Sequence, residues 1–116
     1  MTDPLATYLT EVEGLSAMPW PERQRRLNEA RQGDEEAKRS VIEAYLLDAA
    51  RIALSCPDPP GASDLGKIQE ANLVLIDCVE DASIPDLLAA LKERIPRRLK
   101  SAPHRRPGSD EEEDGH

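Results

Sequence analysis

The chain has 116 residues, which is enough for one small domain. It carries 15 Lys and Arg against 23 Asp and Glu, a formal net charge of −8. This acidic balance argues against nonspecific nucleic-acid binding, which needs a basic surface. Phe is absent and only one Trp and two Tyr are present, so the core must consist of Leu, Ile, Val and Ala, which suits helices better than sheets.

Capping and breaking residues divide the sequence into five expected helices. Asp3 can cap the first helix, and Gly14 should end it. The Gly-Asp pair at 33–34 is both a stop and a start, and the proline-rich stretch 57–63 excludes helix. Pro96 should kink or shorten the last helix. The helices are expected at about 4–13, 21–32, 35–55, 64–82 and 86–99.

The sequence therefore predicts an all-α fold, a small bundle of about five helices, in one domain over residues 1–100. Residues 101–116 are expected to form a disordered charged tail. Prolines and a glycine interrupt this segment, and the acid run Asp110–Asp114 cannot bury apolar area.

Compartment and redox state follow from what the sequence lacks. No apolar run approaches the roughly 18 residues of a membrane span. No basic-then-apolar leader opens the sequence, so no secretory signal is expected. Cys56 and Cys78 could form a disulfide, but a reduced cytoplasmic protein is the simpler interpretation.

No catalytic or metal-binding constellation stands out in the sequence. The two histidines, His104 and His116, lie in the expected tail, so no Ser or Cys has a plausible histidine base. The Cys and His spacing does not match a zinc site, and no Gly-rich phosphate loop is present. We expect neither enzymatic activity nor a cofactor or metal.

The fourth expected helix has two usable faces. Helical periodicity predicts a core-facing stripe of Leu65, Ile68, Asn72, Leu75, Val79 and Ala82. A second face carries Gln69, Leu73, Ile76 and Glu80, with Glu70 and Asp77 beside it. Aliphatic side chains mixed with amides and carboxylates suit protein binding. A buried bundle helix with a mixed polar rim is the alternative interpretation.

Three motifs in order along the chain resemble the sigma-70 family of bacterial RNA polymerase sigma factors. Asp3–Leu9 is similar to the Asp-Pro-x-x-x-Tyr-Leu start of the family's region 1.2. The Gly-Asp-Glu-Glu-Ala helix start at 33–37 is similar to region 2.1, and Ile-Gln-Glu-Ala-Asn at 68–72 to region 2.2. The resemblance covers roughly residues 3–82 and implies a sigma region 2-like helical domain.

The resemblance also implies a partner. In the family, the helix matching residues 68–82 docks on the clamp helices of the largest catalytic subunit (beta prime) of core RNA polymerase. Gln69, Glu70 and Asn72 match the polar positions of the motif, and Ile76 lies where the family has an apolar residue. With the rest of the second face, the residues expected to bind polymerase are Gln69, Glu70, Asn72, Leu73, Ile76 and Glu80.

The segment after Ala82 departs from the family. There, sigma factors carry aromatic and basic residues that capture flipped promoter bases, and stacking needs aromatic faces. Residues 83–100 contain no Phe, Tyr or Trp, and no counterpart of the region 4 helix-turn-helix follows. The side chains left to contact DNA phosphates are Lys92, Arg94, Arg97 and Arg98.

Three functions therefore remain open. The first is a truncated sigma factor-like protein that binds polymerase and modulates initiation. It would act by competing with sigma factors or as one half of a split sigma. A second sigma-like subunit or an anti-sigma partner is a possible further partner. The second is a working small sigma factor that contacts promoter DNA, which the missing aromatics and the acidic balance disfavour. The third is an unrelated helical protein-interaction module.

Overall fold

The computed structural model describes residues 3–57 and 62–101. Those residues form helices and connectors, with no strand among them, so the predicted all-α fold is confirmed. The tail from residue 102 and the middle of the proline-rich loop, residues 58–61, lie outside the described residues. The helices are α1 (Pro4–Leu15), α2 (Trp20–Arg31), α3 (Glu35–Ser55), α4 (Asp64–Glu80) and α5 (Leu87–Ser101).

Side-chain caps set the starts of several helices, among them α1, α3 and α4. Asp3 accepts a hydrogen bond from the Leu5 amide (3.1 Å) at the start of α1. Asp34 caps α3 by accepting from two backbone amides. Ser63 caps α4 by accepting from the amide of Gly66 (3.0 Å). Each cap satisfies backbone donors that have no partner within the helix, which is why these starts agree with the sequence.

The predicted stop of the first helix at Gly14 is wrong, whereas the last helix runs through its proline to about the expected end. α1 continues through Gly14 to Leu15, because the glycine is exposed in the last turn and costs the helix only about 1 kcal/mol. α5 runs through Pro96 to Ser101, two residues beyond the predicted end at about Leu99. The ring of Pro96 removes one backbone hydrogen bond. The apolar residues on either side of it, Ile95 and Leu99, are almost fully buried and hold the helix in place.

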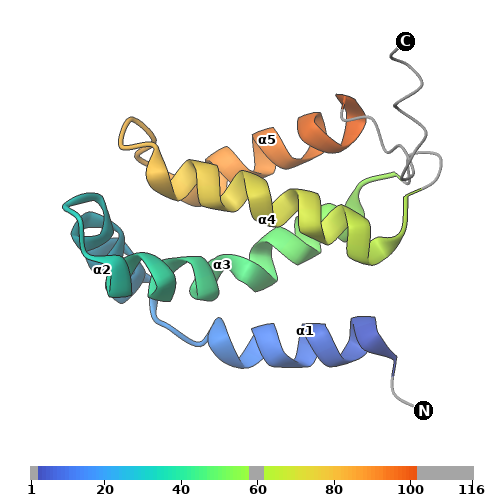
Figure 1. The fold of residues 1–116 in the computed structure, drawn as a ribbon, viewed down its shortest axis with the longest axis horizontal. Coiled ribbons are helices and arrows are strands. Elements are labelled where there is room, and N and C mark those ends of the chain that lie inside the picture. The colour runs from blue at the N-terminus through green and yellow to red at the C-terminus, as the bar shows by residue number, and fades with distance from the viewer. Residues whose placement is uncertain (1–2, 58–61, 102–116) are drawn as a thin grey trace, which may run out of the picture.

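α3 is the central element of the bundle. It packs against each of the other four helices, and α4 packs in turn against α5. In Figure 1, α1 runs along one side of α3, and α5 lies on the opposite side of the molecule. α4 lies between α3 and α5 in this view. α3 is buried on most of its circumference, and small side chains allow the close approach of its neighbours. Its buried residues are Ala37, Val41, Ala44, Tyr45, Leu47, Ala49, Ala50 and Ala53.

The core-facing side of α4 differs from the predicted stripe at both ends. Ile68, Leu75 and Val79 are buried as expected, whereas Leu65 is 38% exposed and Ala82 is exposed. Leu65 lies in the first turn of α4, and Ala82 lies in the connector after the helix has ended at Glu80. Ala71, Val74 and Cys78 of α4 are also buried in the core cluster.

Candidate protein-docking face

One side of α4 faces solvent along the whole helix. Leu73, in the middle of α4, is 49% exposed, and Gln69 and Glu80 are exposed on either side of it along the helix. Ile76 is half-buried and lies outside the core cluster. Residues at these spacings lie on one side of a helix. We call Gln69, Leu73, Ile76 and Glu80 the α4 outer face.

Glu80, at one end of the α4 outer face, forms an ion pair with Lys38 on α3. The Lys38 ammonium donates a hydrogen bond to Glu80, and this contact raises the pKa of Lys38 above its ordinary value. Two shallow hollows meet at Lys38 and Glu35. One, of about 210 Å³, reaches Val79 and Glu80, and the other, of about 430 Å³, follows α3 to Ile42. The two hollows beside the α4 outer face therefore extend onto the first half of α3.

Glu70 is turned away from the α4 outer face. Its Oε1 accepts a hydrogen bond from Nε of Arg98 on α5, at 2.9 Å. Both side chains are partly exposed, so the pair lies on the α4–α5 edge of the molecule. Of the residues expected to bind polymerase, Glu70 thus already has a partner within the chain.

Asn72 is directed toward α1. Its Nδ2 donates to the hydroxyl of Tyr8 at 3.2 Å, which links α1 to α4. Its Oδ1 is buried and accepts no hydrogen bond from the described residues. Asn72 therefore makes an internal contact, as its place on the predicted core-facing stripe indicated, and the face offered to a partner is narrower than the resemblance implied.

The four basic residues considered for DNA contact lie on α5, and two of them pair with carboxylates. Arg97 contacts Glu93 at 3.0 Å, and Arg98 contacts Glu70. Lys92 and Arg94 are exposed. A shallow groove of about 410 Å³ runs between α4 and α5, and it is lined by Val74, Asp77, Cys78, Glu93, Arg94, Arg97 and Arg98.

Sequence reasoning missed the cations that hold these helices in place. The guanidinium of Arg31, at the end of α2, donates to the carbonyl oxygens of Cys78 (3.0 Å), Val79 (3.2 Å) and Ile84 (2.6 Å). The Lys67 side chain is only 1% exposed, and its Nζ donates to the carbonyl of Cys56 (2.8 Å) just after α3. Cations are favourable at helix C-termini, where carbonyl groups lack internal partners.

Within residues 3–57 and 62–101, no group of three or more metal-ligating side chains comes together. None of the helices in that part of the chain combines the length and hydropathy needed to cross a membrane. No family model, no curated protein and no solved structure matches the chain.

Proposed function

We propose that this chain is a sigma factor-like protein that binds core RNA polymerase in the cytoplasm and modulates transcription initiation. The clamp helices of beta prime are the proposed docking partner, and the α4 outer face is the proposed contact. The observation that carries the proposal is Leu73, a large aliphatic side chain held 49% exposed in the middle of that face. Exposed amide and carboxylate groups at Gln69 and Glu80 surround it.

The chemistry of the α4 outer face suits a coiled-coil partner. An apolar residue surrounded by groups that form hydrogen bonds is the usual arrangement at the centre of a protein interface. Gln69 can exchange hydrogen bonds with a polar side chain. Glu80 pairs with Lys38 through Oε2, so it would accept from a partner's arginine through its other carboxylate oxygen. Glu70 and Asn72 contribute less directly, because one pairs with Arg98 and the other with Tyr8.

The proposal includes two modes of action. The chain could compete with complete sigma factors for polymerase, or it could supply one half of a split sigma alongside a second sigma-like subunit. The aromatic side chains that would stack on melted promoter DNA are missing after Ala82. Regulation by occupancy of polymerase is therefore favoured over promoter melting.

The deciding experiment is retention of the chain by purified core polymerase. Leu73→Asp should weaken binding by about 30-fold or more, the loss typical of a central interface residue. Leu15→Asp is the matched control, because Leu15 is 43% exposed but lies at the end of α1. The proposal fails if unmodified protein is not retained at micromolar concentration, or if both variants lose binding equally.

Folding must be separated from docking in this experiment. Ile76→Asp should leave the melting temperature close to that of the unmodified chain while weakening binding, because Ile76 is half-buried outside the core cluster. Leu75→Asp should unfold the domain, because Leu75 is fully buried and the new carboxylate would have no partner. Equal melting of the two variants, measured by circular dichroism, would show that the α4 outer face is wrongly assigned.

Contact with promoter DNA is the second candidate, favoured by the basic residues on α5. A gel shift with promoter DNA and core polymerase distinguishes promoter contact from polymerase binding without DNA contact. Lys92→Gln together with Arg94→Gln should abolish a supershifted DNA complex if α5 contacts phosphates, and should leave polymerase retention unchanged.

A further inference from the structure

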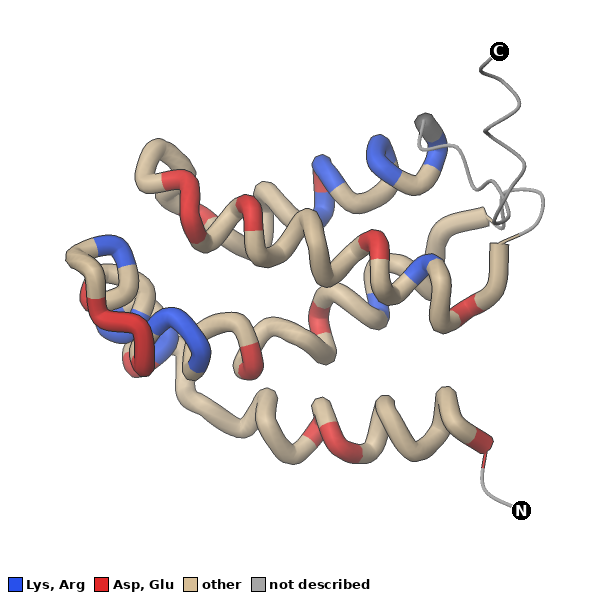
Figure 2. Tube along the Cα trace, viewed as in Figure 1, with Lys and Arg blue, Asp and Glu red and all other residues tan. Residues whose placement is uncertain are grey.

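Basic side chains are concentrated on α5 in an otherwise acidic molecule. Residues 87–101 hold five Lys and Arg and one Glu, whereas the whole chain has a net charge of −8. Figure 2 shows these basic positions on the C-terminal half of α5, away from the acidic positions of α1. A helix that differs in sign from the rest of its own chain can attract an acidic segment of that chain.

Three of these basic side chains line the groove between α4 and α5. Arg94, Arg97 and Arg98 line the groove, together with Asp77 and Glu93. The Arg97–Glu93 pair is an i,i+4 surface contact with both side chains more than 60% exposed. Such pairs contribute only a few tenths of a kcal/mol, so an incoming carboxylate can replace the glutamate at little cost.

An acidic segment follows α5 a short distance further along the chain. Asp110–Asp114 is a run of five consecutive acids, and eight residues separate it from Ser101 at the end of α5. Eight residues can span up to about 27 Å, whereas Arg94 lies about 10 Å back along α5. The Pro107-Gly108 dipeptide is a turn signal, which favours the reversal of direction that this path requires.

We propose that the acidic run Asp110–Asp114 binds the arginine-lined α4–α5 groove and competes there with other polyanions. Because the run is tethered, its effective concentration at the groove is in the millimolar range, and weak contacts suffice. The proposal concerns α5 and does not depend on the assignment of the α4 outer face to polymerase.

The first test measures binding of a heparin hexasaccharide, a polyanion, to the full chain at about 10 mM salt, where screening is weak. Changing Glu111, Glu112 and Glu113 to Gln should raise the affinity roughly five- to tenfold, because the competing acids are gone. Changing Glu11, Glu13 and Glu43 to Gln removes the same net charge from α1 and α3 and should raise it less than about twofold. At about 1 M salt the difference should vanish.

The second test uses backbone amide chemical shifts at the same low salt. The Gln substitutions at 111–113 should move the α5 amides of residues 93–100 and leave those of α1 in place. Unchanged α5 shifts would overturn the proposal, as would an equal gain in heparin affinity in the α1 and α3 control. Shifts confined to Arg105 and Arg106 would mean that the acidic run pairs within its own segment, which also overturns it.

Discussion

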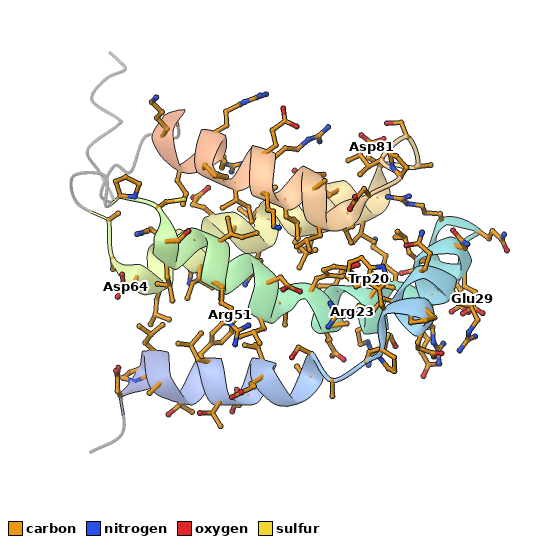
Figure 3. The ribbon with its side chains drawn as sticks, turned by 180° about the vertical axis from the view of Figure 1, so that it is seen from behind. Trp20, Arg23, Glu29, Arg51, Asp64 and Asp81 are labelled. Atoms are coloured by element: carbon orange, nitrogen blue, oxygen red, sulfur yellow. The ribbon has the colours of Figure 1, made fainter. Side chains whose placement is uncertain are left out.

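Arg23 shows how much of this small bundle depends on a single side chain. It is 9% exposed, and it donates to the carbonyl oxygens of Ser16 (2.6 Å) and Met18 (2.9 Å) and to the carboxylate of Asp48 (3.2 Å). Its guanidinium also lies 4.9 Å from the centre of the Tyr45 ring. Figure 3 shows Arg23 close to Trp20 at the start of α2. One guanidinium thus joins the α1–α2 connector to α3.

Arg23→Lys should destabilise the fold by about 2–3 kcal/mol, because an ammonium cannot reproduce the planar fork and leaves buried carbonyl groups without donors. Urea denaturation measures the loss. Arg25→Lys is the matched control, since Arg25 is 55% exposed and pairs with Glu22 and Glu29 on its own helix. The control should stay within about 0.5 kcal/mol of the unmodified chain.

The contact between Tyr8 and Asn72 gives a second prediction. Tyr8→Phe should cost about 1–2 kcal/mol, because Nδ2 of Asn72 loses its acceptor while Oδ1 has no donor among residues 3–57 and 62–101. Adding Asn72→Leu should recover most of that loss, since both polar groups are then replaced by apolar ones. A double-mutant cycle by urea denaturation checks this, and additive losses would contradict the internal role of Asn72.

At the scale of the elements, local chemistry determined what could be predicted from the sequence. The caps Asp3, Asp34 and Ser63 act on amides within three residues of themselves, so the helix starts are readable without any tertiary information. The ends of the α4 stripe were misjudged because Leu65 lies in the first turn of α4 and Ala82 lies beyond Glu80, where the helical periodicity no longer applies.

The candidate site divides in the same way. The solvent-facing positions of Gln69, Leu73 and Glu80 follow from helical periodicity alone. The partners of Glu70 and Asn72 lie 28 and 64 residues away in sequence, and no local pattern indicates such contacts. Periodicity gives the exposed side of a helix, but not which polar groups the fold itself uses.

Two glycines allow the helix ends to be tested with the same substitution. Gly14→Ala should stabilise the fold by about 0.5–1 kcal/mol, because Gly14 is helical and a Cβ there meets no atom within 4 Å. Gly33→Ala should destabilise it by about 1–2 kcal/mol, because Gly33 has φ +106° between α2 and α3. Shifts of the same sign in thermal melting would contradict the assigned backbone conformations.

At the scale of the whole molecule, the α3-centred core determines the response to alkaline pH. Burial raises the pKa of the Cys78 thiol and of the Tyr45 hydroxyl above their ordinary values. The folded chain therefore holds these protons more tightly than the unfolded chain does. Stability from the Cys78 thiol is fully present below about pH 8.5, and it falls as the pH rises toward the folded-state pKa.

Urea denaturation between about pH 7 and pH 10 should show this loss of stability. Cys78→Ala should make the decline shallower above pH 8.5, because the buried thiol no longer titrates, although the substitution itself lowers stability by leaving a small cavity. An equally steep decline in both proteins would mean that the Cys78 thiol has the same pKa in the folded and the unfolded chain, so that its ionisation does not lower the stability.

The contacts of Arg31 have a consequence for assembly. Its three acceptors lie 47, 48 and 53 residues further along the chain, at the end of α4 and in the turn before α5. During synthesis, α2 and α3 are made before those carbonyl groups exist, so the Arg31 side chain reaches its final contacts only after α4 and the turn before α5 have been made. A chain severed between Cys56 and Ser63 would place Arg31 on one piece and its three acceptors on the other, so this contact would form only when the two pieces associate.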